Sequence, residues 1–99
     1  MSDAAEPDAA VTSDTVLRLG RGFRLQWEPA QEAHVLLYPE GMVNLNLSAA
    51  EILKRCDGQR SIAHITAELE QVFDEPDLSQ EVLSFAAIAV EQRWLQEVS

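Results

Sequence analysis

Residues 45–62, LNLSAAEILKRCDGQRSI, are the most informative part of this chain for its fold class. It opens on the end of an alternating pattern that is typical of a strand. Ser48 and Glu51 then have the spacing of a capping box, in which each side chain accepts from a backbone amide of the other residue. Gly58 can adopt the positive φ that a helix exit needs, and Ser61 begins a second helix. A strand, a short helix, a tight turn and a second helix form the core of a small winged-helix-like module.

Three short strands are predicted up to this stretch. Phe23, Leu25 and Trp27 alternate with polar residues, which is the period of a half-buried strand. Residues 33–38 form the second strand and residues 42–47 the third. Because the intervening turns are short, the three strands are expected to form an antiparallel meander.

Three helices are predicted after the strands. The first covers residues 48–55, and the second starts at Ser61. Asp77 caps the third, with Gln80 at its capping-box position, and that helix runs to about Trp94. The predicted fold class is therefore α+β: a winged-helix-like, three-stranded antiparallel sheet followed by three helices.

The third helix carries two apolar stripes, whereas a monomeric surface helix needs one. The stripe that docks the helix on the core consists of Leu78, Val82, Phe85 and Ala89. The second stripe lies on another side of the helix and consists of Leu83, Ala87, Val90 and Trp94. Two interpretations stay open: a small core wraps this helix more fully, or the second stripe contacts a partner or a second copy of the chain.

Composition limits the possible partners. The 99 residues suffice for one domain with a modest core. The formal net charge of −10 repels phosphate backbones, so nucleic-acid binding is not expected. No apolar run approaches the roughly 20 residues that span a bilayer, and one cysteine cannot form an internal disulfide. These features predict a soluble cytoplasmic protein without a membrane partner.

The chain divides unevenly into a tail and a domain. Residues 1–15 are small and acidic and contain almost no large apolar side chains. Such a segment cannot bury enough surface to offset the entropy of ordering, so a disordered tail is expected there. Residues 16–99 are expected to form the folded domain.

The sequence offers little catalytic chemistry. It has no Gly-rich phosphate loop, C-x-x-C, H-E-x-x-H or G-x-S-x-G motif. Cys56 is expected inside the core and His64 in solvent. His34 is expected on a strand face, and the sequence indicates no partner for it. The acids Asp74, Glu75, Asp77 and Glu81 are expected to form a solvated turn. Neither a metal, a cofactor nor a catalytic residue is predicted; a thiol or metal enzyme would need Cys56 exposed beside a histidine.

Charge is unevenly placed along the sequence. Six of the seven basic residues lie between Arg18 and Arg60, whereas eight acids and only Arg93 follow. One end of the molecule is therefore expected to be mildly basic and the other strongly acidic. Such a layout can orient a peptide or protein partner.

The residues also carry a family resemblance. The elements S-A-x-E-I-L, C-D-G and S-I-x-x-I between Leu45 and Ile65 resemble the PqqD family, peptide chaperones of pyrroloquinoline quinone (PQQ) biosynthesis. The similarity extends from about Leu17 to the Arg-Trp-Leu at residues 93–95. Ser48 stands where threonine is commoner in the family, and Arg93 stands where a glycine frequently precedes the tryptophan.

The resemblance implies a function and a site. Members of this family bind the precursor peptide PqqA and present it to PqqE, a radical S-adenosylmethionine (SAM) enzyme that cross-links a glutamate to a tyrosine. The leader adds as a strand to the edge of the third strand, and the third helix forms the other wall. The expected peptide-binding residues are Met42, Val43, Asn44, Leu45, Asn46 and Leu47 on the strand, with Leu83, Ala87, Val90 and Trp94 on the helix. The chain is then a non-catalytic carrier.

Two other functions remain open at this point. A leader-recognition domain from another peptide-modification pathway would share all of these features. A winged-helix transcription regulator would share the order of elements, but it would need a basic recognition helix, and the second helix has Glu68 and Glu70 with no Lys or Arg. The exposed strand edge could also pair two copies of the chain into a homodimer.

Overall fold

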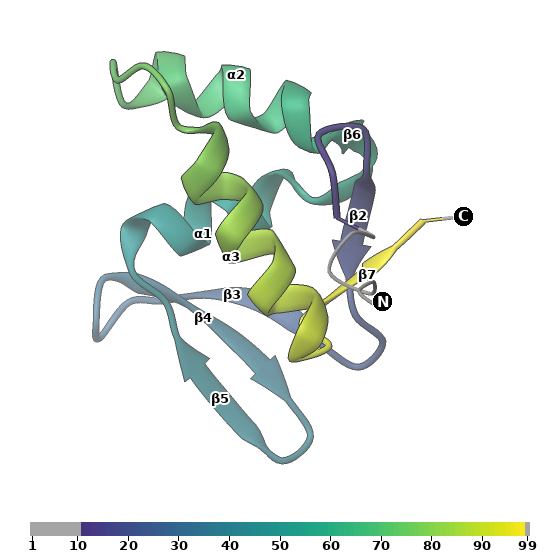
Figure 1. Ribbon diagram of the computed structural model, residues 1–99. Helices are drawn as coiled ribbons and strands as arrows, with labels where there is room; N and C mark the ends of the chain where they lie inside the picture. Colours follow the sequence, from purple (N-terminus) through teal and green to yellow (C-terminus); the bar gives the residue numbers. More distant parts are fainter. Residues whose placement is uncertain (1–10, 99) are drawn as a thin grey trace.

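The computed structural model describes residues 11–98 and contains the predicted antiparallel sheet (Figure 1). Its strands are β3 (Arg24–Glu28), β4 (Ala33–Tyr38) and β5 (Gly41–Asn44), in the order β3-β4-β5. Val35 and Leu36 are neighbours that point to opposite faces, yet both are buried. The central strand is therefore covered on both faces, which anchors the sheet in the core.

The third strand is shorter than predicted, and the first helix has a different cap. The strand ends at Asn44, and α1 (Leu47–Arg55) follows almost directly. The Asn46 side chain, not Ser48, accepts the hydrogen bond from the Ala49 N–H, at 2.8 Å. The predicted capping box is wrong because asparagine two positions earlier already occupies the N-cap. The glutamate of that box forms ion pairs further along the helix instead.

A second three-stranded sheet was not predicted. It has the order β6-β2-β7 and joins β2 (Val16–Leu19), β6 (Asp57–Ser61) and β7 (Leu95–Glu97). Gly58 has the predicted positive φ, +80°, but it lies inside β6 and not at a helix exit. The fold therefore remains α+β with three helices, and the tight turn between the first two helices is replaced by a strand that pairs with β2.

The second helix begins where the sequence predicts. Ser61 is the N-cap of α2 (Ile62–Val72), and its hydroxyl accepts from the His64 N–H at 3.2 Å. Asp74, two residues after the last residue of the helix, is left-handed with a φ of 52°. The Glu75 N–H donates to the Glu70 carbonyl oxygen at 2.9 Å, which is the hydrogen bond of a Schellman motif and terminates the helix.

The start of α3 (Ser79–Glu91) differs from the prediction. Asp77 has a φ of 60° and makes no capping bond, so the predicted cap is wrong. The neighbouring Leu78 N–H donates instead to the Glu70 carboxylate of α2, at 3.0 Å. Glu70 thus binds the backbone of the N-cap residue of α3, and no side chain caps the first turn of this helix in the described part.

The end of α3 is also earlier than predicted. The helix stops at Glu91, and Arg93 takes a left-handed conformation with a φ of 70°. The Trp94 N–H donates to the Ala89 carbonyl at 2.9 Å, again as a Schellman motif. A Cβ on Gly20 would overlap the Arg93 carbonyl oxygen, and the Gly20 N–H donates to the Trp94 carbonyl at 2.7 Å. Only glycine at position 20 allows the turn after α3 to approach this closely, and the approach places β7 beside β2.

The core lies between the two sheets and the helices. Its fully buried side chains come from every layer and include Leu17, Leu36, Ile65, Ala86 and Leu95. In Figure 1, α3 runs from α2 at the top of the view down to β7, and both of these elements pack against it. Within residues 11–98, no helix has the length and apolarity to cross a bilayer.

Five residues of the predicted tail lie in the described part and pack on the domain. Thr15 is buried, and Val11 packs against the core. The Ser13 carbonyl accepts from the Ala63 N–H at 2.8 Å, in the first turn of α2. The prediction of disorder for residues 1–10 lies outside the described residues.

Candidate binding site

Strand β5 forms one edge of its sheet. Within residues 11–98 it pairs with β4 only, in the register that places Val43 opposite Leu36. Its other side therefore presents backbone N–H and C=O groups to an additional strand. Met42 is 48% exposed, Asn44 is exposed, and Val43 is half-buried against the core.

The remaining predicted strand residues have separate positions. Leu45 is buried, and its N–H donates to the His34 carbonyl at 3.4 Å. Asn46 caps α1, as described above. Leu47, the first residue of α1, is 66% exposed. These six residues (42–47) are consecutive in the chain, and they are called the line here: it runs from an open strand edge through the α1 cap to an exposed leucine.

The line ends in an apolar pocket of about 500 Å³. The pocket lies between the start of α1, the end of α2 and the first half of α3, and its floor includes Ile52, Leu69, Phe73, Val82 and Phe85. Leu47, Glu75 and Glu81 are at its rim, and within the described part no cation pairs with either carboxylate. The sequence did not reveal this pocket because it exists only where three helices meet.

The two predicted stripes of α3 are not separate surfaces. The docking side is centred on Val82, Ala86 and Ala89, and Ala86 belonged to neither stripe. Phe85 is only half-buried, and its ring lies 6.3 Å from that of Trp94, which was assigned to the second stripe. The second stripe is half-buried too, since its members Leu83, Val90 and Trp94 pack against the core. Ala87 is half-buried, and Ile88, which neither stripe contained, is 51% exposed.

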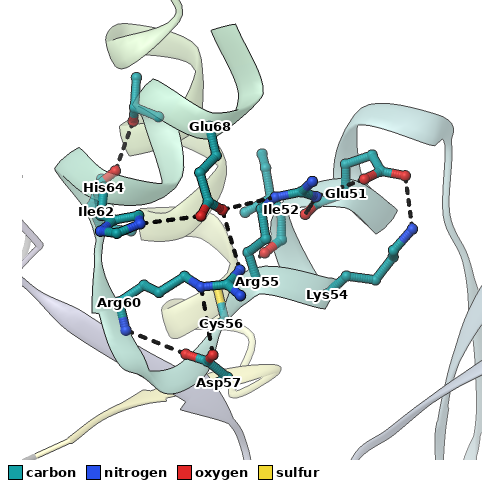
Figure 2. Close-up of polar contacts among 11 residues, drawn as sticks. Glu51, Ile52, Lys54, Arg55, Cys56, Asp57, Arg60, Ile62, His64 and Glu68 are labelled. Atoms are coloured by element: carbon teal, nitrogen blue, oxygen red, sulfur yellow. Dashed lines mark hydrogen bonds and ion pairs between the residues drawn. The ribbon is translucent and has the colours of Figure 1, made fainter. Parts of the chain in front are cut away.

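A cluster of ion pairs lies away from this line. Glu68 of α2 accepts from Arg55 at 3.1 Å, from Arg60 at 3.2 Å and from His64 at 3.1 Å (Figure 2). Arg55 also pairs with Glu51, and the hydrogen bonds from Arg55 and Lys54 hold the pKa of Glu51 below its ordinary value. The cluster joins α1, β6 and α2, so its role is to fix these elements together. His64 is exposed, as predicted.

Cys56 is buried, as predicted. Its Sγ lies 3.3 Å from the Ile52 carbonyl oxygen, to which the thiol donates. Burial raises the pKa of the thiol to about 12, so the thiolate that nucleophilic chemistry or metal binding needs is disfavoured at neutral pH. His34 contacts the Trp27 ring edge-on, with 5.2 Å between ring centroids. Within residues 11–98, no three His, Cys, Asp or Glu side chains come together as potential metal ligands.

The fold and the free edge define a class of small α+β proteins with a winged-helix-like core. A solved structure of this class matches with a TM-score of 0.76 and 31% sequence identity, over 92% of this chain and 99% of the other. It is the solution structure of the PqqD truncation of Methylobacterium extorquens PqqCD, described as a functional and stand-alone recognition element for ribosomally synthesized and post-translationally modified peptides (RiPPs).

The chain belongs to the PqqD family. The profile of Coenzyme PQQ synthesis protein D (PqqD) matches residues 33–95. A protein of Azotobacter vinelandii named "PqqA binding protein" is 55% identical over 86 residues, which cover 86% of this chain and 94% of that protein. A Pseudomonas aeruginosa protein of the same name is 54% identical over 84 residues, covering 84% and 91% of the two chains.

Proposed function

We propose that this chain is a non-catalytic peptide chaperone of PQQ biosynthesis. It binds the precursor peptide PqqA as an additional strand on β5 and presents it to the radical SAM enzyme PqqE in the cytoplasm. The observation that carries the proposal is the free edge of β5, which leads into the apolar pocket at Leu47. The names of the relatives, which describe PqqA binding, support the identity of the peptide.

The geometry suits an extended peptide better than a folded ligand. Backbone hydrogen bonds to the edge supply affinity that is independent of the peptide sequence, while side-chain pockets supply specificity. Met42 and Leu47 lie at the two ends of this line and are both strongly exposed. A bound strand would cover both side chains, and a residue of the peptide would enter the pocket lined by Val82 and Phe85.

Delivery to PqqE needs no chemistry from the carrier. Its most reactive side chain, Cys56, is buried and held protonated. A carrier instead holds the peptide in one extended conformation, which removes part of the entropy that the enzyme would otherwise lose on binding it. A homodimer formed through β5 would use the same edge and would therefore compete with the peptide.

The first experiment maps the contact surface by nuclear magnetic resonance. Amide shifts of the ¹⁵N-labelled chain are followed while unlabelled PqqA is added. We expect the largest changes at residues 41–47 and at Leu83, Ala87, Val90 and Trp94 of the second stripe. Changes that cluster instead at residues 64–71 of α2 would show that the peptide binds elsewhere. A precursor peptide from an unrelated pathway serves as the competitor that tests specificity.

The second experiment places a charge in the groove. Ala87→Glu is expected to weaken PqqA binding at least tenfold, about 1.4 kcal/mol, because it puts a carboxylate on the side of α3 that is proposed to contact apolar residues of the peptide. Ala67→Glu is the matched control, since position 67 is exposed on α2 and distant from β5 in the sequence. Circular dichroism melts of both variants show whether a loss of binding comes from unfolding. If Ala87→Glu unfolds the chain and Ala67→Glu does not, the second stripe is core and the wall of the groove is misplaced.

A further inference from the structure

The basic residues of this acidic chain fall into two groups. One group is neutralised by carboxylates within hydrogen-bonding or ion-pairing distance: Lys54, Arg55 and Arg60. The other group makes no ion pair with any residue from 11 to 98: Arg18, Arg21, Arg24 and Arg93. These four guanidinium groups carry positive charge that no carboxylate of the described part neutralises, in a chain of net charge −10.

Two members of the free group share a cavity. Arg21, in the turn before β3, and Arg93, in the turn after α3, line a cavity of about 390 Å³ together with Phe23 and Val90. Among residues 11–98, Glu97 is the one carboxylate of its lining, and it pairs with neither arginine. Two guanidinium groups above an apolar floor are suited to a carboxylate on an aliphatic stem.

A third arginine extends the basic surface. Arg18 and Arg21 line a neighbouring cavity of about 510 Å³. Arg18 is held by a neutral partner, because the Gln96 amide, with its oxygen turned toward the guanidinium, accepts from it at 3.0 and 3.1 Å. Such a contact orients the side chain and leaves its charge uncompensated.

The backbone conformation of Arg93 is a second, independent indication that this side chain has a function. Its φ of 70° is left-handed, a conformation that glycine adopts without strain and other residues adopt at a cost in free energy. Arg93 is exposed and makes no side-chain hydrogen bond that would offset this cost within the described part. An arginine is therefore held where glycine would make the fold more stable.

The arginine cavity adjoins the proposed site through Val90 of the second stripe, and it lies beside the start of β3, at the end of the sheet where β4 and β5 join. The Phe23 ring, which lines the cavity, stacks on Tyr38 with 5.3 Å between centroids. Tyr38 pairs with Gly41, the first residue of β5. At the other end of the line, Leu47 adjoins the apolar pocket with Glu75 and Glu81 at its rim. The site thus has a basic end near the β4–β5 hairpin and an acidic end near Leu47, and the four residues of β5 between them span about 13 Å.

We infer that Arg21 and Arg93, with Arg18 beside them, form a carboxylate-binding subsite for the peptide that pairs with β5. The subsite sets the direction of the peptide: its acidic residues lie toward the β4–β5 hairpin, and an apolar or basic residue about six positions away enters the pocket at Leu47. The opposite direction places peptide acids beside Glu75 and Glu81, where like charges repel. This inference rests on the proposed peptide binding.

The test uses the full chain, synthetic full-length PqqA and two arginine substitutions. Arg21→Gln removes one guanidinium, and Arg93→Gly removes the other while relieving the left-handed strain. We expect the double variant to bind PqqA about tenfold more weakly than the unchanged chain in 50 mM salt, and the difference to shrink in 300 mM salt. Arg93→Gly alone should bind more weakly and yet melt at a higher temperature, so a loss of binding cannot come from unfolding.

Lys54→Gln is the matched control. It removes one positive charge, as Arg93→Gly alone does, and is compared with that single variant; Lys54 belongs to the neutralised group on α1. We expect its affinity for PqqA to stay within twofold of the unchanged chain. An equal loss in this control would mean that total charge, and not the arginine subsite, sets the affinity, which would overturn the inference.

A second peptide identifies the ligand chemistry. PqqA with every Asp and Glu replaced by Asn and Gln should bind the unchanged chain and the double variant equally. The arginine side-chain Nε–H signals of Arg21 and Arg93 should shift with PqqA and not with this amide peptide.

Three results would overturn the inference. If the double variant binds PqqA within twofold of the unchanged chain, the subsite has no role, although the proposed function stands. If the unchanged chain does not bind PqqA, the proposed function fails as well. If the chain binds a 20-nucleotide single-stranded DNA and loses that binding in the double variant, the arginines form a phosphate site.

Discussion

The Cys56 thiol is made unreactive by its burial in the core. It donates to the Ile52 carbonyl at 3.3 Å and is 4% exposed. Cys56→Ser places a hydroxyl in this apolar site and should lower the free energy of unfolding by about 1–3 kcal/mol. The folded fraction should keep its affinity for PqqA. Urea denaturation and anisotropy measure the two quantities, and full stability with abolished binding would contradict a purely structural cysteine.

Gly20 is a position where adding a single methyl group should lower the stability of the fold. A Cβ there would overlap the Arg93 carbonyl oxygen, which belongs to the backbone and cannot rotate away. Gly20→Ala is expected to lower the free energy of unfolding by about 1–3 kcal/mol, by forcing β7 away from β2. Gly41→Ala is the control, because its Cβ would lie 3.4 Å from the Tyr38 hydroxyl, which is ordinary contact. Equal losses in the two variants would show that the turn adapts.

The helix ends of this chain depend on residues outside the local pattern. The Leu78 N–H at the start of α3 donates to the Glu70 carboxylate, while Asp77 is left-handed. Glu70→Ala should therefore destabilise the chain by about 1 kcal/mol, as the loss of a cap does. Asp77→Gly should instead stabilise it by about 1 kcal/mol, because glycine adopts this φ freely. Thermal melts show whether each variant is more or less stable than the unchanged chain. A loss of stability in Asp77→Gly would show that the aspartate does cap the helix.

The N-terminal segment separates into two parts that truncation can distinguish. Removal of residues 1–10 should leave the thermal midpoint unchanged, since their composition favours disorder. Removal of residues 1–14 also deletes Val11 and the Ser13 carbonyl that accepts from Ala63, so the midpoint should fall by about 5 °C or more. Scanning calorimetry of the two truncated chains checks this difference. A large drop on removing only residues 1–10 would show that they pack on the domain.

For the molecule as a whole, the free β5 edge can hold either a peptide or a second copy of the chain. If both use the same backbone groups, saturating PqqA should convert any dimer into a one-to-one complex. Light scattering after size-exclusion chromatography, with and without PqqA, measures the molar mass directly. The Ala67→Glu variant should behave as the unchanged chain does. A dimer that persists with peptide bound would place the dimer contact on another surface.

Much of the molecule follows from local sequence. The strands around residues 24–28 and 33–38, the Ser61 cap of α2 and the burial of Cys56 agree with the predictions, because each depends on side-chain period or on neighbouring atoms. The sheet β6-β2-β7 could not be predicted in this way. Its strands are three to five residues long and pair residue 19 with residue 95, so no local period reveals them.

The α+β class, the edge position of the third strand and the family could be inferred from the sequence, because side-chain alternation and short motifs are local properties. What lies at each end of that edge depends on packing between elements that are distant in the sequence. The apolar pocket needs α1, α2 and α3 to meet, and the arginine cavity needs the turn before β3 to approach the turn after α3. Residues 21 and 93 are far apart in the chain, so only packing can place their charges together.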